Sequence, residues 1–237
     1  MRKAIVIGGT SGIGRAFGEL LLKNNYRVGL AGLERDNLTT LQRDYADLLE
    51  IQYFDCITEK SSLKIPELVE CLGGLDLLVF SAGIGHLNKN LGFEAENHAN
   101  KVNVLAFTEV IDWGYRFFER QGRGHLVGIT SIAGLFGYGQ APAYNAAKSY
   151  QITYLEGLRQ KARKSGKSIC ITDIRAGFVD TDFSKDLKRF WVATPEKAAR
   201  QILSTISSGS GVGYVTRRWV LIAWLLKSLP GWIRVRL

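Results

Sequence analysis

The feature that most constrains the fold of this chain is a glycine-rich turn near its start. Residues 4–7 form a short run that favours a β-strand, residues 8–14 (Gly-Gly-Thr-Ser-Gly-Ile-Gly) interrupt it, and a helical pattern follows at residues 15–23. Strand, glycine turn and helix in this order predict a loop that cradles the pyrophosphate of a dinucleotide. The alternative is a glycine turn with a purely structural use.

Each glycine of the turn has a physical role in that prediction. Gly8 makes the tight turn, Gly12 lets the backbone approach the pyrophosphate, and Gly14 lets the helix pack close to the strand. The start of the helix adds free N–H groups and the positive end of its dipole, both of which stabilise phosphate. The residues expected to contact the cofactor here are Gly8, Thr10, Ser11, Gly12, Ile13, Gly14 and Arg15.

Strand and helix patterns alternate along the remaining chain. A chain of 237 residues with 46% apolar content can bury a full core, and α/β chains of this size often form one domain. The alternation predicts a single-domain, Rossmann-like α/β fold, in which a doubly wound parallel sheet carries helices on both faces. Further strands are expected at residues 26–31, 49–54, 75–80, 125–130, 169–174 and 213–216, and helices at 36–46, at 93–120 and from 194 onward.

The distribution of charge argues against a nucleic-acid-binding surface. The formal net charge is +9, but residues 217–237 contain five basic residues and no acidic one. More than half of the excess therefore lies at the C-terminal end, and no nucleic acid is expected as a partner of the body.

The cysteines and the first residues bear on the cellular compartment. Cys56, Cys71 and Cys170 are odd in number and lack the spacing of metal ligands, so we expect free thiols, a reducing compartment and no metal. The first three residues run directly into a strand, which leaves no room for a secretory leader. The cytoplasm is the expected location.

The end of the second expected strand bears on which cofactor binds. An acidic residue there hydrogen-bonds the ribose hydroxyls of NAD, whereas a basic one accommodates the phosphate of NADP. The chain has glycine and leucine at this point, followed by Glu34 and Arg35. Because Arg15 and Arg35 are the available cations, NADP(H) is favoured, while Glu34 is the contrary sign and NAD(H) stays possible.

Two other strand ends place residues on the edge of the sheet where such folds bind ligands. Asp55 follows the third strand and is a candidate acceptor for the adenine amino group, although a turn or cap aspartate is the other interpretation. Ala82 and Gly83 follow the fourth strand and are small enough to permit close approach by a cofactor.

A tyrosine and a lysine four residues apart suggest proton chemistry. Tyr144 and Lys148 share one face of a helix at this spacing, so the ammonium group can stabilise a phenolate. Such a pair also occurs by chance in surface helices. Ser131 ends the fifth strand, and a glycine-containing loop can bring its hydroxyl to that of Tyr144.

Together these motifs resemble the short-chain dehydrogenase/reductase family over about residues 3–216. The family's Asn-Asn-Ala-Gly stretch is Phe80-Ser81-Ala82-Gly83 here, and its Pro-Gly turn is Ala176-Gly177. The family's catalytic set is complete, as Asn103, Ser131, Tyr144 and Lys148. The resemblance also implies that Gly177, Val179 and Thr181 contact the cofactor, Thr181 at the nicotinamide amide.

The resemblance implies an NAD(P)-dependent oxidoreductase that moves a hydride between nicotinamide and a carbonyl or alcohol. Tyr144 would exchange the proton, and Lys148 would lower the pKa of Tyr144 and hold the nicotinamide ribose. Ser131 would hydrogen-bond the reacting oxygen, and Asn103 would hold a water linking Lys148 to solvent, or simply kink a buried helix. The alternative function is a non-catalytic dinucleotide sensor or scaffold, because a fold alone does not establish activity.

The substrate side contains many aromatic residues. Phe183, Phe190 and Trp191 lie in residues 182–193, which cover the substrate in the family, and Leu135, Phe136 and Tyr138 follow the fifth strand. They favour a hydrophobic small-molecule substrate, although ordinary packing explains the same composition.

The C-terminal segment is basic, apolar and rich in tryptophan. Residues 219–226 are apolar but far short of the ~20 residues that span a membrane. Because the family resemblance covers about residues 3–216, residues 1–216 are expected to form the NAD(P)-binding catalytic domain. Residues 217–237 are expected to contact either a membrane interface or another subunit of a homodimer or homotetramer.

Overall fold

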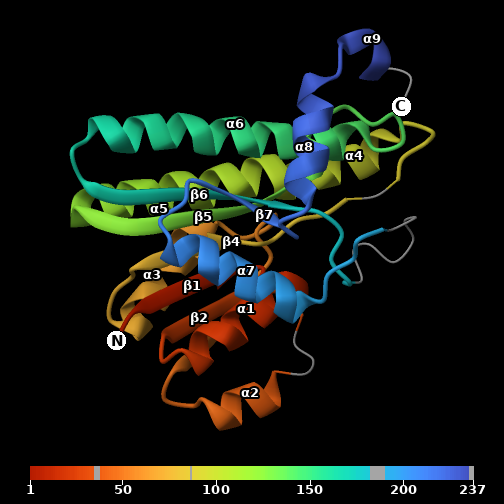
Figure 1. Ribbon diagram of the computed structural model, residues 1–237. Coiled ribbons are helices and arrows are strands. Elements are labelled where there is room, and N and C mark those ends of the chain that lie inside the picture. The colour runs from red at the N-terminus through yellow and green to blue at the C-terminus, as the bar shows by residue number, and fades with distance from the viewer. Residues whose placement is uncertain (35–37, 86, 182–189, 235–237) are drawn as a thin grey trace.

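The computed structural model describes the chain except for residues 35–37, 86, 182–189 and 235–237. Within the described residues, seven parallel strands form one sheet in the order β3-β2-β1-β4-β5-β6-β7 (Figure 1). The strands are β1 (Lys3–Ile7), β2 (Arg27–Gly32), β3 (Leu49–Tyr53), β4 (Leu77–Phe80), β5 (Arg123–Ser131), β6 (Ser168–Ala176) and β7 (Val212–Val215).

Helices cover both faces of the sheet, because side chains of successive strand residues point to opposite faces. Ala4 and Val6 pack under α1 (Gly12–Lys23) and α7 (Pro195–Ser207). Ile5 and Ile7 pack under α3 (Ser61–Leu72), α5 (Phe107–Gln121) and α6 (Pro142–Lys164), and a short α2 (Thr39–Asp44) precedes β3. The predicted doubly wound, Rossmann-like sheet is confirmed.

The strand order reverses between β1 and β4, which is where such sheets bind ligands. The chain leaves β1 toward β2 and β3 on one side, and then crosses to β4 on the other. The crevice at the carboxyl ends of these two strands is therefore the expected place of the cofactor. The glycine turn and residues 81–83 both lie there.

Two helical regions differ from the sequence prediction. The helix expected at residues 93–120 is interrupted, with a π-helical stretch at Lys101–Ala106 between α4 (Phe93–Asn100) and α5. The stretch contains Asn103, whose buried side chain bonds the Ile84 backbone, and π-helical turns inside α-helices are frequent at functional sites. The prediction omitted α3, which has Pro66 inside it, a residue that normally marks a helix end.

The C-terminal segment forms α8 (Trp219–Ser228) and α9 (Gly231–Arg234). In Figure 1, α8 stands beside the end of α6 and carries α9 beyond the sheet. Its lower end packs against β7 and against the 3-10 turn Ile132–Leu135 that follows β5. Among the described residues, no helix combines the length and the apolar character that crossing a membrane requires.

Candidate active site

The glycine turn has the backbone geometry that a dinucleotide loop requires. Gly8 and Gly12 have φ values of +77° and +51°, which are left-handed conformations that favour glycine. The N–H groups of Gly8 and Gly9 both donate to the Ala31 carbonyl, at 2.7 and 2.9 Å. The side chain of Ser11 makes no capping hydrogen bond, so the first N–H groups of α1 are left for an anion.

The turn is packed so closely on its neighbours that larger residues do not fit. A Cβ on Gly14 would collide with the Gly8 carbonyl, and one on Gly8 would collide with the Ala82 backbone. A Cβ on Gly12 would lie 3.3 Å from Cγ2 of Thr181, so the start of α1 directly faces the loop after β6. The glycine turn is therefore closely packed against residues 81–82 and against Thr181.

The end of β4 shows how the chain manages without the family's asparagine pair. The N–H groups of Ser81 and Ala82 donate to the Ile7 carbonyl at 2.7 and 3.1 Å, which ties β4 to β1 through the backbone alone. A Cβ on Gly83 would lie 3.2 Å from Asn103 Oδ1 and 3.5 Å from Lys148 Nζ. Ala82 and Gly83 therefore connect the glycine turn to the lysine.

The adenosine side is only partly described. The Glu34 N–H donates to Thr10 Oγ1 at 3.3 Å, and the Glu34 side chain is exposed. Arg15 is half-buried and donates to Glu19 at 2.9 Å, while Arg35 lies outside the described residues. Asp55 accepts the Ile57 N–H at 2.8 Å, which is the bond of a turn aspartate.

Ser131 and Tyr144 meet at the carboxyl end of β5. Ser131 ends that strand, and its hydroxyl donates to the Ala176 carbonyl at 3.2 Å and accepts the Ala133 N–H at 3.1 Å. A hydrogen bond also joins its hydroxyl to that of Tyr144. The fold therefore brings together two hydroxyls that are 13 positions apart in the sequence.

Asn145 holds the loop between these two residues in place, and the sequence prediction did not include it. Its buried amide donates to the carbonyls of Ala133 and Phe136, at 2.9 and 3.0 Å. Both carbonyls belong to the loop that leads from Ser131 to α6. The only sequence signal was an amide side chain directly after Tyr144, beside a loop rich in glycine.

Lys148 is buried among backbone and amide groups. Its ammonium donates to the Ile129 carbonyl at 3.3 Å and to Gln151 Oε1 at 3.0 Å. Gln151, which is fully buried, donates in turn to the Asn103 carbonyl at 2.8 Å. Asn103 bonds the Ile84 backbone through both ends of its amide. Gln151 thus bridges the Lys148 ammonium to the Asn103 carbonyl.

Gln151 is a second residue that sequence reasoning missed. It lies three positions after Lys148, a spacing that places both side chains on one face of α6. A glutamine there has no catalytic signature by itself. Its significance comes from the π-helical stretch, which carries the Asn103 carbonyl to the same point.

Burial dominates the titration of both groups, so the expected lowering of the Tyr144 pKa by Lys148 is not found. Desolvation raises the pKa of Tyr144 to about 12, and its bond with Ser131 lowers it only in part. Desolvation lowers the pKa of Lys148 to about 8, with the Asp173 carboxylate acting in the opposite direction. The ammonium is 5.8 Å from the centre of the Tyr144 ring and donates its bonds elsewhere.

Comparison with known proteins agrees with this geometry. The sequence matches the short chain dehydrogenase family model over residues 2–190. The chain belongs to the short-chain dehydrogenase family. Members of this family are NAD(P)-dependent oxidoreductases that act on CH–OH or C=O groups of small molecules and typically form oligomers.

Several relatives of this short-chain dehydrogenase are similar over most of its length. An uncharacterized oxidoreductase of Myxococcus xanthus is 33% identical, with 77% of this chain and 74% of that protein covered. A very-long-chain 3-oxoacyl-CoA reductase of Macaca fascicularis is 23% identical, with 99% of this chain and 77% of that protein covered. The solved structure of gox2181 is 21% identical, with a TM-score of 0.78 over 90% of this chain and 93% of that one, and it shares the fold.

An aromatic cluster centred on Trp219 lies beside the turn after β6 in this short-chain dehydrogenase. The Trp219 ring lies 5.0 Å from Phe190, 5.7 Å from Trp191 and 5.7 Å from Phe178, measured between ring centres. A Cβ on Gly177 would collide with the Trp219 indole, so α8 forms a wall of the turn after β6. Val179 pairs with Ala193 at the base of this segment, while Phe183 lies outside the described residues.

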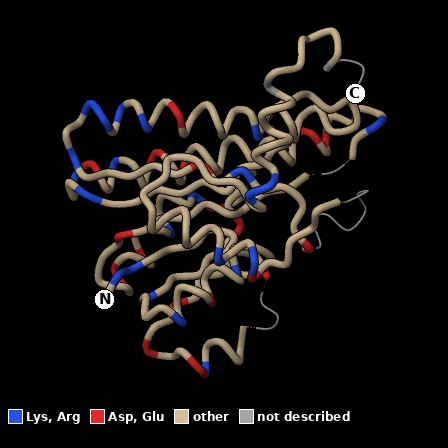
Figure 2. Tube along the Cα trace, viewed as in Figure 1, with Lys and Arg blue, Asp and Glu red and all other residues tan. Residues whose placement is uncertain are grey.

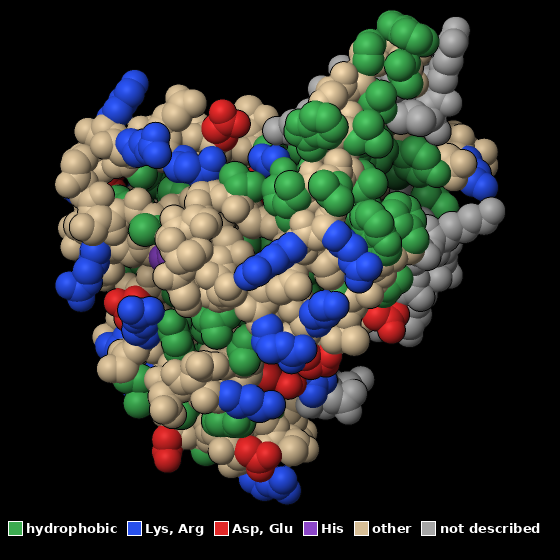
Figure 3. All heavy atoms as spheres, viewed as in Figure 1, with side chains coloured by type: hydrophobic (Ala, Val, Ile, Leu, Met, Phe, Trp, Pro, Cys, Tyr) green, Lys and Arg blue, Asp and Glu red, His purple; other side chains and the backbone are tan. Residues whose placement is uncertain are grey.

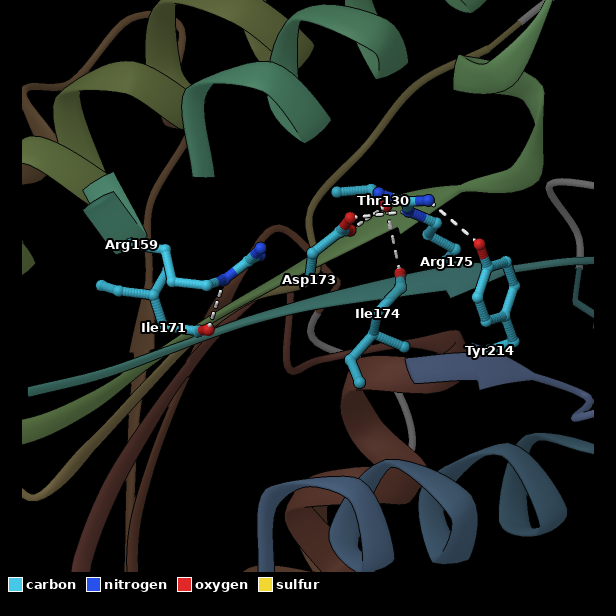
Figure 4. Close-up of polar contacts among 7 residues, drawn as sticks. All are labelled: Thr130, Arg159, Ile171, Asp173, Ile174, Arg175 and Tyr214. Atoms are coloured by element: carbon cyan, nitrogen blue, oxygen red, sulfur yellow. Dashed lines mark hydrogen bonds and ion pairs between the residues drawn. The ribbon is translucent and has the colours of Figure 1, made fainter. Parts of the chain in front are cut away.

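A buried ion pair supports the strands beneath the site. Asp173 and Arg175 of β6 are joined at 2.7 Å, and both side chains are almost fully buried (Figure 4). Thr130 of β5 donates to the same carboxylate, and Arg175 donates to the Tyr214 hydroxyl of β7 at 3.0 Å. The three neighbouring strands β5, β6 and β7 are thus linked through side chains. The sequence analysis did not predict this cluster.

Proposed function

We propose that this short-chain dehydrogenase transfers a hydride between nicotinamide and a hydrophobic carbonyl or alcohol, with NADP(H) favoured over NAD(H) and Tyr144 as the acid/base. The observation that carries the proposal is the hydrogen-bonded pair of Ser131 and Tyr144 hydroxyls beside buried Lys148, at the edge of the sheet that also holds the glycine turn. Nucleotide-binding backbone and proton-exchanging groups at one edge support hydride transfer.

The residues that would hold the cofactor come from several loops at the carboxyl edge of the sheet. Residues 8–15 would bind the phosphates, and Lys148 and Tyr144 would bind the nicotinamide ribose. Ala82 and Gly83 would lie along the cofactor, with Asp55 at the adenine and Gly177, Val179 and Thr181 at the nicotinamide. A bound nicotinamide supplies or accepts the hydride.

The chain's own residues handle the proton. Because burial raises the pKa of Tyr144 to about 12, the phenol keeps its proton near neutral pH, which is the form that donates during carbonyl reduction. Ser131 hydrogen-bonds the oxygen on which charge develops, a contribution of roughly 3 kcal/mol in comparable oxyanion sites. Lys148 supplies a positive charge on the same helix face as Tyr144, and Gln151, bonded to the Asn103 carbonyl, holds that ammonium in position.

The preference for NADP(H) rests on Arg15 and Arg35. Arg15 lies in the first turn of α1, beside the glycine turn, and its bond to Glu19 leaves its side chain partly exposed. Exposed Glu34 is the contrary sign. Rates measured separately with NADPH and NADH test this preference.

The preference for a hydrophobic substrate rests on the Trp219 cluster. Phe190 and Trp191 leave part of their surface exposed above it. The relative from Macaca fascicularis, a very-long-chain 3-oxoacyl-CoA reductase, matches 99% of this chain, so the match includes the C-terminal segment. A carbonyl on a long apolar chain fits both observations.

We also propose the wider setting of the reaction. Residues 1–216 act as the catalytic domain, and residues 217–237 act as a contact segment. The protein works in the cytoplasm as a homodimer or homotetramer, and residues 217–237 also make peripheral contact with a membrane.

Replacement of Tyr144 by phenylalanine tests the mechanism directly. Tyr144→Phe should lower kcat by on the order of 10²–10⁴-fold, because the proton donor is lost. Cofactor affinity, followed by quenching of tryptophan fluorescence, should change little. The matched control is Tyr150→Phe on the same helix, which removes an exposed hydroxyl bonded to Thr108 and should leave the rate unchanged.

The assay follows oxidation of NADPH or NADH with a panel of long-chain ketones and aldehydes. Near-normal turnover by Tyr144→Phe would show that this residue is not the acid/base. If the wild-type protein bound the cofactor but turned over no member of the panel, the result would favour a non-catalytic dinucleotide sensor or scaffold over an enzyme.

A further inference from the structure

Helix α8 is apolar on both of its sides. Trp219, Ala223 and Leu226 are buried against the body at positions one or two turns apart. The opposite side carries Val220, Leu221, Trp224 and Leu225, whose exposed fractions are 47%, 67%, 70% and 48%. A helix that is apolar all round needs a second apolar or interfacial partner.

The exposed side of α8 is continued by other apolar residues. Trp232 of α9 is exposed, and at the other end Phe190, Trp191 and Val192 are also exposed. Figure 3 shows hydrophobic side chains gathered over α8 and α9. We call α8, α9 and residues 190–192 the apolar face.

The apolar face is continuous with the substrate side of the active site. Phe190 and Trp191 contact Trp219, which lies against Gly177 in the turn after β6. Helix α8 also packs on the turn that directly follows Ser131. Whatever covers the apolar face therefore lies next to the entry side of the site.

The charge around the apolar face indicates the nature of its partner. Arg217 and Arg218 are exposed at the start of α8, and Arg218 lies 5.4 Å above the ring of Trp191. From residue 217 onward the sequence has five basic residues and no acidic one, so Figure 2 shows no red along α8 and α9. An anionic partner would be attracted to this edge.

A second copy of the chain fits this face less well. A two-fold interface places the same patch on both subunits, so the basic residues of 217–237 would face the same segment of the other copy, which contains no acidic residue. Aromatic residues with a polar end and flanking arginines instead match the interface between lipid headgroups and acyl chains. The short length of α8 suits a helix that lies in this interface.

We propose that the apolar face docks onto an anionic lipid bilayer, with α8 and α9 lying in the headgroup region. Leu221, Trp224 and Trp232 enter the apolar boundary, and Arg217 and Arg218 contact the anionic headgroups. Docking does not depend on catalysis. If the proposed function also holds, docking presents the entry side to the membrane, so a long-chain carbonyl substrate can enter from the bilayer without crossing water.

The experiment measures vesicle binding by the full-length protein. Sedimentation is compared for vesicles of phosphatidylcholine alone and vesicles that also contain phosphatidylglycerol. The wild type should bind the anionic vesicles, and added salt should weaken this binding. Leu221→Glu and Trp224→Glu should each reduce the partition coefficient by roughly tenfold or more, because a carboxylate enters the apolar boundary.

Leu63→Glu is the matched control, since Leu63 is 65% exposed and Leu221 is 67% exposed. It lies on α3, away from the apolar face, and should leave binding unchanged. A wild type that does not bind anionic vesicles, or an equal loss in Leu63→Glu, would overturn the proposal. Sedimentation velocity without lipid tests whether a second copy of the chain covers the apolar face instead. If Leu221→Glu converted an oligomer to a monomer while lipid binding persisted, the face would be a subunit interface. None of these readouts requires turnover, so a failure of docking is distinct from a failure of the catalytic assignment.

Discussion

At the scale of single residues, the arrangement around Lys148 is the most informative feature. A buried ammonium is costly, and here two backbone or amide oxygens replace the water that it has lost. Gln151 is the residue of this arrangement best suited to substitution, because its amide connects Lys148 to the Asn103 carbonyl. Gln151 positions the charge of Lys148, and it is not among the residues proposed to contact the cofactor or the substrate.

This bridge gives a prediction about pH. The pKa of Lys148 is lowered to about 8, so the charged form is present below that pH and is lost as the pH rises through it. We expect kcat/KM to fall through the same range. Gln151→Met removes an acceptor and should move the fall to lower pH by about one unit, while Gln151→Glu adds a negative charge and should move it to higher pH.

The control for this series is Gln160→Met, at an exposed position of the same helix, which should leave the pH profile in place. Rates are to be measured across the pH range with one accepted substrate and saturating cofactor. Shifts of Gln151→Met and Gln151→Glu in the same direction would exclude the proposed effect on the lysine charge. A merely structural role would lower stability without moving the profile.

At the scale of elements, the strands at the active-site end of the sheet are held by a polar cluster as well as by the ladder. Figure 4 shows the Asp173 carboxylate directed at Thr130 and Arg175, while Arg175 reaches Tyr214. β5, β6 and β7 each contribute one or two of these side chains. Because β5 carries Ser131 and β6 leads into Gly177, this cluster helps to fix two walls of the site.

Breaking the ion pair on one side should be costly. Asp173→Asn leaves a buried guanidinium without its counter-charge, and we expect a loss of about 3–5 kcal/mol in the free energy of unfolding. The double replacement Asp173→Leu with Arg175→Met removes both charges and should recover most of that loss. Denaturant titration of each variant provides the measurement.

The surface pair of Asp112 and Arg116 is a natural control, since its two groups are 3.0 Å apart but well exposed. Asp112→Asn should cost at most about 1 kcal/mol. Equal costs for Asp173→Asn and Asp112→Asn would mean that burial of the β6 pair does not matter.

At the scale of the whole molecule, Trp219 joins the C-terminal helices to the body. It is almost fully buried, touches the turn after β6 and anchors the aromatic cluster. Trp219→Ala should lower the free energy of unfolding by about 3–5 kcal/mol, because it leaves a large cavity. Exposed Trp224→Ala should change it by no more than about 0.5 kcal/mol.

The comparison separates two roles of one helix. Thermal and denaturant unfolding of both variants show whether α8 is a structural part of the enzyme, while vesicle binding of Trp224→Ala reports on its outer side. If Trp219→Ala were as stable as the wild type, α8 would be a detachable segment and truncation at residue 217 would be harmless.

The sequence by itself determined the order of the strands, most of the helices, the parallel sheet and the family, although it missed α3 and the π-helical break before α5. The features that it did determine depend on local signals. These signals are runs of β-favouring residues, glycines at positions where a tight turn requires them, and a helical spacing that brings Tyr144 near Lys148. A cap such as Thr194 before Pro195 is likewise a local signal, and α7 begins there. Nearby residues carry most of this information, so it can be read without knowing the fold.

Only the tertiary structure decided what surrounds those residues. The Gln151 bridge needs the Asn103 carbonyl, 48 positions away, and the wall formed by Trp219 needs Gly177 from another element. The direction of the Tyr144 pKa shift also depends on burial, which the spacing to Lys148 does not reveal. Desolvation and contacts between distant elements are properties of the packed chain, and they set the chemistry of a site whose residues the sequence had placed in order.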